Sequence, residues 1–456
     1  MEYLMKKIIC HIFALLVCAL ILFPQTVQAA SKEDVDSLIQ NLPQVWPEAP
    51  SIASEAGLLL EPQSGTILFA KNATDAHYPA STTKLMTALL TLEHCSLDEV
   101  VTFSSSAVLT LEPGSSHIGL RVGEQLTVKD SLYGLLLPSA NEVANGLAEH
   151  VAGSTDAFAA MMNERAAQLG AVNTHFSNPH GLHDDTHYTC AYDLALITKA
   201  CIQIPSFVEI DSAPTYVRQA DSLLNKEIPM GSTHKMMREN SGYYDPDVIC
   251  GKTGWTQQSG RCLVTYAERD GLPLICVVMK SEDPQQYEDT KALLEYGFSN
   301  FKLLRASVND PDFSQGQSSS SPLKIPTEAL SLVTLDSDSW VVMPDSVSFE
   351  QLDKSVSESG ENGSSSVIYR LDGYPLGSAV LRASGQTVEN NMFLSDSQEN
   401  ALSVSAEGLF VINVWIVLGG AALLALGVLA GSRIYILQKK RKEKARKKEE
   451  RPRYRY

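Results

Sequence analysis

Hydrophobic and polar positions divide residues 51–305 into a strand-rich start, a helical middle and a strand-rich end. Two short apolar runs, 58–60 and 66–70, flank the turn sequence Pro62-Gln63-Ser64-Gly65 and predict a hairpin. Helical periodicity follows in four segments, at 82–94, 142–152, 156–169 and 191–202. Strand-like patterns close the region at 248–250, 262–267 and 274–279. This order predicts an α+β fold, in which one mainly antiparallel sheet is completed by distant parts of the chain and flanked by helices.

The pattern changes beyond residue 305. Residues 306–322 form a predicted linker, rich in Ser and Gln toward its end. Residues 323–392 predict a small β domain, because Gly and Ser separate short strand-like runs there, at 330–335, 340–343, 367–371 and 378–382. A polar juxtamembrane spacer, 393–408, follows.

The N-terminal segment has the layout of a secretory signal. Lys6 and Lys7 precede an apolar stretch, 8–23, and Val27-Gln28-Ala29 offers small residues for cleavage. We therefore expect residues 1–29 to be a signal peptide and residues 30–50 to be a short lead-in to the folded domain. An uncleaved membrane anchor is the alternative interpretation.

A second apolar stretch, 409–431, contains no charged residue. As a helix its 23 residues would span roughly 34 Å, enough to cross a bilayer core. Within the tail 432–456, residues 439–456 hold eleven Lys and Arg against three Glu, which indicates a cytoplasmic end. The two termini together predict a single-pass protein of the cell membrane, anchored by a C-terminal transmembrane helix with its catalytic domain outside the cytoplasm. A soluble form would need proteolytic release.

The net charge limits which partners the protein can bind, and the cysteine positions limit which disulfides it can form. The formal net charge is −17, and because residues 439–456 carry +8, the rest of the chain carries −25. Such an acidic ectodomain argues against nucleic-acid binding. Six cysteines remain after the signal segment: Cys95, Cys190, Cys201, Cys250, Cys262 and Cys276. A helix between Cys190 and Cys201 would hold them about 16 Å apart, too far for a disulfide, whereas Cys262 and Cys276 flank a predicted hairpin and are candidates for one.

The first candidate chemical motif is Ser81-Thr82-Thr83-Lys84, at the start of an apolar helix. Ser-x-x-Lys alone is a weak signal, since it recurs at Ser232, Ser299 and Ser321. Residues i and i+3 share a helix face, so the Ser81 hydroxyl and the Lys84 amine can meet. The alternative makes Ser81 a helix cap and Lys84 a solvated residue. The helix dipole, burial and a second cation would all lower the pKa of Lys84 and make its neutral amine a base.

Two further strings complete the pattern. Ser139-Ala140-Asn141 precedes a predicted helix, where Ser139 fits a proton relay and Asn141 an orienting residue, but where ordinary helix capping is the alternative. Lys252-Thr253-Gly254 follows the strand 248–250 and occurs once. Lys252 and Thr253 are candidates to hold a substrate carboxylate beside a strand edge, and Gly254 would allow close approach. A Gly-terminated strand with an exposed Lys is the alternative.

The three strings together are more specific than any one of them. They occur in the order expected for penicillin-binding proteins and class A β-lactamases, at intervals of 58 and 113 residues. Each falls on the secondary-structure element that its role requires. We therefore expect them to converge on one acyl-transfer site.

With these strings the chain resembles the serine-type D-Ala-D-Ala carboxypeptidases, the low-molecular-mass penicillin-binding proteins of peptidase family S11. The resemblance covers residues 50–305 strongly and the β domain weakly. The matching strings are Ala80-Ser81-Thr82-Thr83-Lys84-Leu85-Met86-Thr87, Pro138-Ser139-Ala140-Asn141-Glu142, Phe176-Ser177-Asn178-Pro179-His180-Gly181-Leu182 and Gly251-Lys252-Thr253-Gly254-Trp255-Thr256. The implied fold is a serine β-lactamase/DD-peptidase-like domain.

The resemblance implies a mechanism and its participants. Ser81, deprotonated by Lys84, would attack the bond between the last two D-alanines of a peptidoglycan muropeptide stem, and Ser139 would assist the leaving amine. The backbone N–H groups of Ser81 and Trp255 would hold the oxyanion. β-Lactam antibiotics would acylate the same serine, and no cofactor or metal would be needed. The cluster His180, His183, Asp184, Asp185 and His187 is expected to be structural rather than a metal site.

Two rival functions remain open at this stage. A serine β-lactamase would need a carboxylate that activates water, but no Glu-x-x-Leu-Asn segment lies between Asn141 and Lys252. A non-enzymatic β-lactam sensor would need a substantial cytoplasmic output, whereas this tail is short and basic.

Overall fold

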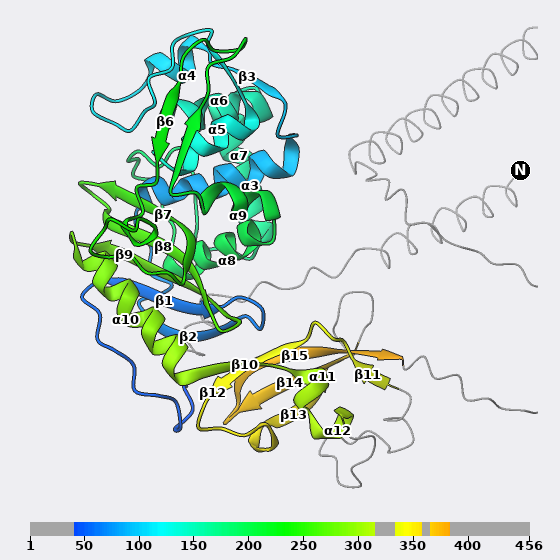
Figure 1. The fold of residues 1–456 in the computed structure, drawn as a ribbon. Coiled ribbons are helices and arrows are strands. Elements are labelled where there is room, and N and C mark those ends of the chain that lie inside the picture. The colour runs from blue at the N-terminus through cyan, green and yellow to red at the C-terminus, as the bar shows by residue number, and fades with distance from the viewer. Residues whose placement is uncertain (1–40, 315–332, 358–364, 384–456) are drawn as a thin grey trace, which may run out of the picture. The chain divides into compact units, whose positions relative to one another are not determined.

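A five-stranded antiparallel sheet forms the centre of the catalytic region in the computed structural model, which describes residues 41–314, 333–357 and 365–383. Its strand order is β2-β1-β9-β8-β7, so the first two strands of the chain add to the last three (Figure 1). The strands are β1 (Ala56–Glu61), β2 (Thr66–Lys71), β7 (Val248–Thr256), β8 (Gly260–Arg269) and β9 (Leu272–Ser281). Strand β7 is an edge strand of this sheet.

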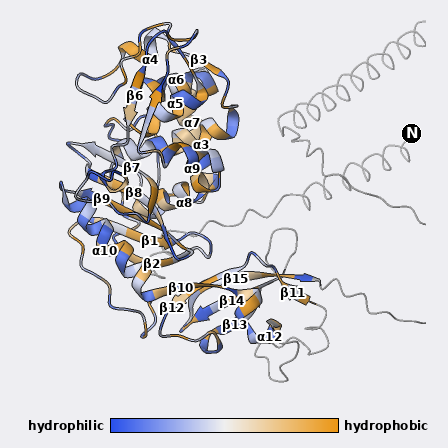
Figure 2. Ribbon diagram, viewed as in Figure 1, coloured by the Kyte–Doolittle hydropathy of each residue, from blue (hydrophilic) through white to orange (hydrophobic). Residues whose placement is uncertain are grey.

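The two faces of the sheet bury different sets of side chains. On β9, Ile275, Val277 and Met279 join a core formed with the helices of the middle segment. The alternate residues, among them Leu274 and Val278, pack in a second core beneath α10 (Gln285–Asn300). This period of two is the expected result of burying both faces of a strand. Hydrophobic residues accordingly recur along the inner strands and the helices that cover them (Figure 2).

The middle of the chain forms a helical subdomain with two small hairpin-like sheets. Its longer helices are α3 (Lys84–His94), α5 (Val128–Leu136), α6 (Asn141–Ala152), α7 (Thr155–Gln168), α8 (Ala191–Ile202) and α9 (Pro205–Asp211), with the short α4 (Ser105–Leu109). The small sheets pair β3 (Val100–Thr102) with β4 (Gln125–Thr127), and β5 (Thr215–Arg218) with β6 (Ile228–Gly231). Helix α3 is almost wholly buried, from Lys84 through Thr91.

A second antiparallel sheet follows, in the order β10-β12-β15-β14-β13, with β11 paired to β15. Its strands are β10 (Phe301–Arg305), β11 (Val333–Leu335), β12 (Trp340–Pro344), β13 (Asp353–Ser357), β14 (Ser366–Leu371) and β15 (Tyr374–Ala383). Two short helices, α11 (Ala306–Asn309) and α12 (Pro311–Ser314), lie between β10 and β11. Strand β10 therefore places the last five residues of the expected catalytic domain in the second sheet.

Most predicted elements are present, and the differences concern their extent. The hairpin at 58–70 and the four predicted helices occur within two residues of their expected bounds. Strand β7, however, continues through Lys252-Thr253-Gly254 to Thr256, so this motif lies inside a strand rather than after its end. The candidate disulfide is wrong, because Thr265 rather than Cys262 lies opposite Cys276, and all six cysteines are free thiols.

The predicted signal peptide, juxtamembrane spacer, transmembrane helix and basic tail lie outside the described residues. Among the helices that the structure does describe, none has both the length and the apolar character needed to cross a bilayer.

Candidate active site

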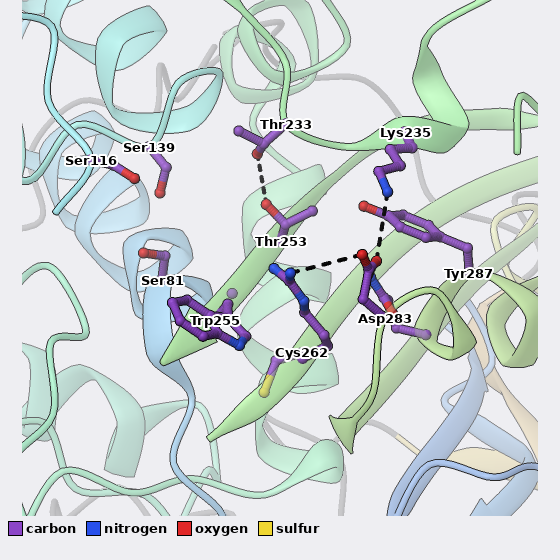
Figure 3. A pocket seen from close by; sticks show the side chains of 13 residues that line it. Ser81, Ser116, Ser139, Thr233, Lys235, Thr253, Trp255, Cys262, Asp283 and Tyr287 are labelled. Carbon is purple, nitrogen blue, oxygen red and sulfur yellow. Dashed lines mark hydrogen bonds and ion pairs between the residues drawn. The ribbon is translucent and has the colours of Figure 1, made fainter. Parts of the chain in front are cut away.

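A cleft of about 290 Å³ lies between the helical subdomain and the edge of the central sheet. Five of the predicted site residues line it: Ser81, Ser139, Thr253, Gly254 and Trp255. Ser81 and Ser139 face each other on one side, and Thr253 lies on the strand opposite (Figure 3). The other three, Lys84, Asn141 and Lys252, are fully or almost fully buried behind the lining. The structure thus brings the three sequence strings together in one place.

Ser81 lies in a tight turn that is held from several sides. The turn is the short 3-10 helix η1 (Ala80–Thr83), and its first residue, Ala80, has a φ of +49°. Such a left-handed conformation is costly for alanine and is typical of functional sites. Gly181 packs against it so closely that a β-carbon there would lie 1.8 Å from the Ala80 carbonyl oxygen. Neither Ser81 nor Thr83 caps the following helix with its side chain, which argues against the capping interpretation of Ser81.

The Lys84 amine is buried and makes three hydrogen bonds. Its Nζ lies 2.9 Å from Ser81 Oγ, 2.7 Å from Asn141 Oδ1 and 2.8 Å from the His180 carbonyl oxygen. Burial, and then the nearby Lys252 cation, lower the pKa of Lys84 well below its ordinary value, while Glu142 opposes this shift. A buried amine of lowered pKa in contact with a hydroxyl is able to accept that hydroxyl's proton.

Ser139 presents an unpaired hydroxyl to the cleft. It is 4% exposed, its φ is +65°, and its Oγ has no hydrogen-bond partner among the described residues. The N-cap of α6 is Ala140 rather than Ser139, so the capping alternative does not apply to this serine. A buried hydroxyl without a partner costs about 1–3 kcal/mol, which is consistent with a group kept ready for a ligand.

The sequence predicts Lys252 in contact with a substrate carboxylate beside a strand edge, but its side chain lies in the interior. Its side chain is fully buried, and Nζ donates to the Thr253 carbonyl oxygen at 3.1 Å. Burial lowers the pKa of Lys252, while the negative charge of Asp211 opposes this. Asp211, also buried, accepts the Gly251 N–H at 2.9 Å. The exposed-lysine alternative is therefore wrong, and Lys252 lies behind the residues that line the cleft.

Gly254 and Trp255 set the wall of the cleft beside Ser81. A β-carbon at Gly254 would lie 2.8 Å from the Pro79 carbonyl oxygen and 3.2 Å from the Ser81 backbone nitrogen. Glycine is thus required here by the close approach of the Ser81 turn, whereas the predicted close approach of a substrate stays a prediction. Trp255 is 58% exposed, and the Arg261 guanidinium lies over its ring.

Several lining residues carry no motif and were missed by the sequence analysis. Thr233 Oγ1 lies 2.6 Å from Thr253 Oγ1. Lys235 and Arg261 lie 3.6 and 3.9 Å from the Asp283 carboxylate, and each is about a third exposed (Figure 3). Ser116 faces Ser81 and Ser139. No local pattern marks these positions, although Lys235 belongs to one of the Ser-x-x-Lys copies that lacked supporting context.

The histidine-rich segment 180–187 braces the Ser81 turn. The Ser177 N–H donates to His187 Nδ1 at 2.9 Å, so Nε2 carries the ring hydrogen and donates to Thr83 Oγ1 at 2.7 Å. Burial lowers the pKa of His187 to about 4 and that of His180 to about 3. Both rings are therefore neutral at physiological pH. The His187 ring contacts Thr83 in the turn, and the His180 carbonyl oxygen, not its ring, accepts from Lys84.

Comparison with known proteins gives consistent results. The family model of D-alanyl-D-alanine carboxypeptidases matches residues 44–283. D-alanyl-D-alanine carboxypeptidase DacA of Haemophilus influenzae is 30% identical over 361 residues, which cover 75% of this chain and 88% of that protein. DacF of Bacillus subtilis is 32% identical over 55% of this chain. The match spans 63% of DacF and 66% of the Escherichia coli carboxypeptidase DacC, just under two thirds of each.

Solved structures share the fold. Penicillin-binding protein 5 from Haemophilus influenzae aligns with a TM-score of 0.59 and 26% identity, over 74% of this chain and 98% of that one. A D-alanyl-D-alanine carboxypeptidase from Mycobacterium tuberculosis aligns with a TM-score of 0.52 and 28% identity, over 57% of this chain and 96% of that one.

A substitution at Glu142 tests whether Lys84 is the base, because the Glu142 charge affects the pKa of Lys84. Glu142 Oε1 accepts the Ile118 N–H at 2.7 Å, and Glu142→Gln keeps an acceptor there while removing the charge that stabilises the Lys84 ammonium. The pKa of Lys84 should fall further, so the acid limb of the pH profile for Ser81 acylation by fluorescent penicillin should move to lower pH. Glu164→Gln, on the exposed side of α7, is the control and should leave the profile unchanged. A shift to higher pH would contradict the assignment.

Proposed function

The chain belongs to the D-alanyl-D-alanine carboxypeptidase family, and we propose from this membership that it removes the terminal D-alanine from peptidoglycan pentapeptide stems through an acyl-serine intermediate. The observation that carries the proposal is the buried Lys84 amine 2.9 Å from Ser81 Oγ. This pair supplies a nucleophile and its base at the floor of a cleft whose far wall is the edge strand β7. The sequence between Asn141 and Lys252 contains no Glu-x-x-Leu-Asn segment, so the β-lactamase alternative lacks its water-activating carboxylate there.

In the acylation step, Ser81 Oγ attacks the carbonyl carbon between the two D-alanines while its proton passes to Lys84. The developing oxyanion is held by the backbone N–H groups of Ser81 and Trp255, each such donor being worth about 2.7–4 kcal/mol in the transition state. Ser139 then passes a proton to the departing amine of D-alanine. Its unpaired, buried hydroxyl supports this role, since no internal hydrogen bond has to be broken first. Water hydrolyses the acyl-enzyme in the second step, and β-lactams acylate the same serine.

The free carboxylate of the substrate is bound by the wall opposite Ser81. Thr253 offers its hydroxyl at this wall, while the buried Lys252 contributes positive potential from behind it. Lys235 is the accessible cation that completes this subsite, together with Arg261, because both line the cleft and Asp283 is the only acidic residue among the lining residues. The specificity for a C-terminal residue follows from this requirement for a carboxylate.

Ser81→Ala tests the nucleophile. The variant should lose covalent labelling by fluorescent penicillin and release no D-alanine from a pentapeptide, because Ser81 carries the only hydroxyl that contacts the Lys84 amine in the described part of the chain. The wild-type protein should release D-alanine and turn over a chromogenic cephalosporin only slowly. Rapid cephalosporin hydrolysis would instead favour the β-lactamase alternative, and stoichiometric acylation with no D-alanine release would favour the sensor.

Lys235→Gln tests the carboxylate subsite. We expect KM for the pentapeptide acid to rise about tenfold with a smaller change in kcat, since a charge-assisted hydrogen bond is worth roughly 1.5–3 kcal/mol. The same variant should act on a pentapeptide amide as the wild type does. Lys302→Gln, whose amine contacts the Asp345 carbonyl oxygen on the second sheet, is the matched control. Equal losses on the acid and the amide would contradict the assignment.

Residues 409–431 provide the membrane anchor, with the tail 432–456 in the cytoplasm and the cleft outside. The uncharged length of this segment and the excess of Lys and Arg after it support the arrangement. A protein truncated before Leu409 should leave the membrane fraction and retain penicillin labelling. Its continued sedimentation with membranes would contradict the anchor.

A further inference from the structure

Two helices connect the catalytic residues to a second group of polar side chains. Helix α3 begins at Lys84 and α6 begins at Asn141, and these two residues are hydrogen-bonded at 2.7 Å. Cys95 follows the last residue of α3, and His150 lies in the last turn of α6. Ten residues of helix separate Lys84 from His94, or about 15 Å. The two helices therefore start together at the catalytic site and end together at a different place.

At that second place, three potential ligands converge. Cys95 Sγ, a Glu99 carboxylate oxygen and a His150 ring nitrogen all lie within 4.8 Å of one another. His150 Nε2 is 3.1 Å from Glu99 Oε2. The other carboxylate oxygen of Glu99 accepts the Ser96 N–H at 2.6 Å, which fixes the orientation of the carboxylate in the loop between α3 and β3. Cys95 and Glu99 come from the connection between α3 and β3, whereas His150 comes from α6, so the fold brings two separate segments together here.

We propose that Cys95, Glu99 and His150 bind a zinc ion. Thiolate, imidazole and carboxylate are the three ligand types that zinc takes in proteins, whereas magnesium and calcium prefer oxygen alone. Tetrahedral zinc holds neighbouring ligand atoms roughly 3.5 Å apart, so small side-chain rotations bring this set into range. The side chains of Glu99 and His150 are 43% and 24% exposed, which leaves room for water as the fourth ligand.

A thiol binds zinc as the thiolate, so metal binding at Cys95 exchanges a proton for the ion. Zinc binding would break the S–H bond, release that proton to solvent and form the Zn–S bond. The ion would then neutralise the Glu99 charge and join the ends of α3 and α6 that lie away from Ser81. This inference rests on the fold alone and not on the proposed activity, and it differs from the sequence-based expectation of no metal.

Metal uptake by the full-length protein tests the proposal. After incubation with micromolar Zn²⁺ and removal of excess, the wild type should retain one ion per chain, and Cys95→Ser and Glu99→Gln should retain none. Cobalt substitution should give a sulfur-to-metal charge-transfer band that Cys95→Ser abolishes. His94→Gln, the adjacent exposed histidine at the end of α3, is the matched control and should bind as the wild type does.

Thermal unfolding provides a second readout. At a hundredfold excess over Kd, Zn²⁺ should raise the Tm of the wild type by on the order of 5 °C, with no rise in Cys95→Ser and none with Mg²⁺. Fluorescent penicillin labelling of Ser81 shows whether each variant is folded. A wild type that retains no zinc, or a Cys95→Ser variant that retains as much as the wild type, would overturn the proposal, leaving Glu99 and His150 as an ordinary ion pair.

Discussion

The burial of the Lys84 amine is the constraint on which the rest of the site depends. A desolvated amine is costly unless its hydrogen-bonding capacity is met, and here Ser81, Asn141 and the His180 carbonyl oxygen meet it. These partners come from three separate parts of the chain. The packing that brings them together also keeps water away from the amine, so one arrangement secures both the contact with Ser81 and the lowered pKa.

Close contacts between backbone segments hold the Ser81 turn in place beside Lys84. The Ser81 turn lies between Gly181 on one side and Gly254 on the other, and a β-carbon at either position would collide with backbone atoms of the turn. Confined in this way, Ala80 holds its left-handed conformation. The nucleophile is thus positioned by main-chain contacts more than by side-chain ones, which explains why short strings containing glycine and small residues mark this site.

Sequence analysis located the three motifs and the elements that carry them, because helix and strand periodicity is a local property. It placed Lys252 at a strand end, whereas the strand continues through it and its ammonium lies buried near Asp211, 41 residues earlier in the chain. The register of β8 against β9, which separates Cys262 from Cys276, likewise depends on pairing rather than on pattern. Thr233 and Lys235 reach the cleft from the segment after β6, where Lys235 begins a short 3-10 helix and the sequence has no distinctive composition. Long-range packing decides all of these positions, and a single sequence does not display it.

The unsatisfied hydroxyl of Ser139 has a thermodynamic consequence for the resting protein. The left-handed backbone of Ala80 and the desolvated Lys84 amine add to the cost of this hydroxyl. The free energy of the protein without a ligand is therefore raised at its active site, as is common where stability is lost in favour of activity. A ligand bound in the cleft lowers this free energy where it supplies the missing hydrogen bond. A ligand group that pairs with the Ser139 hydroxyl would recover this cost, so we expect a protein with an occupied cleft to resist heat better than the empty one.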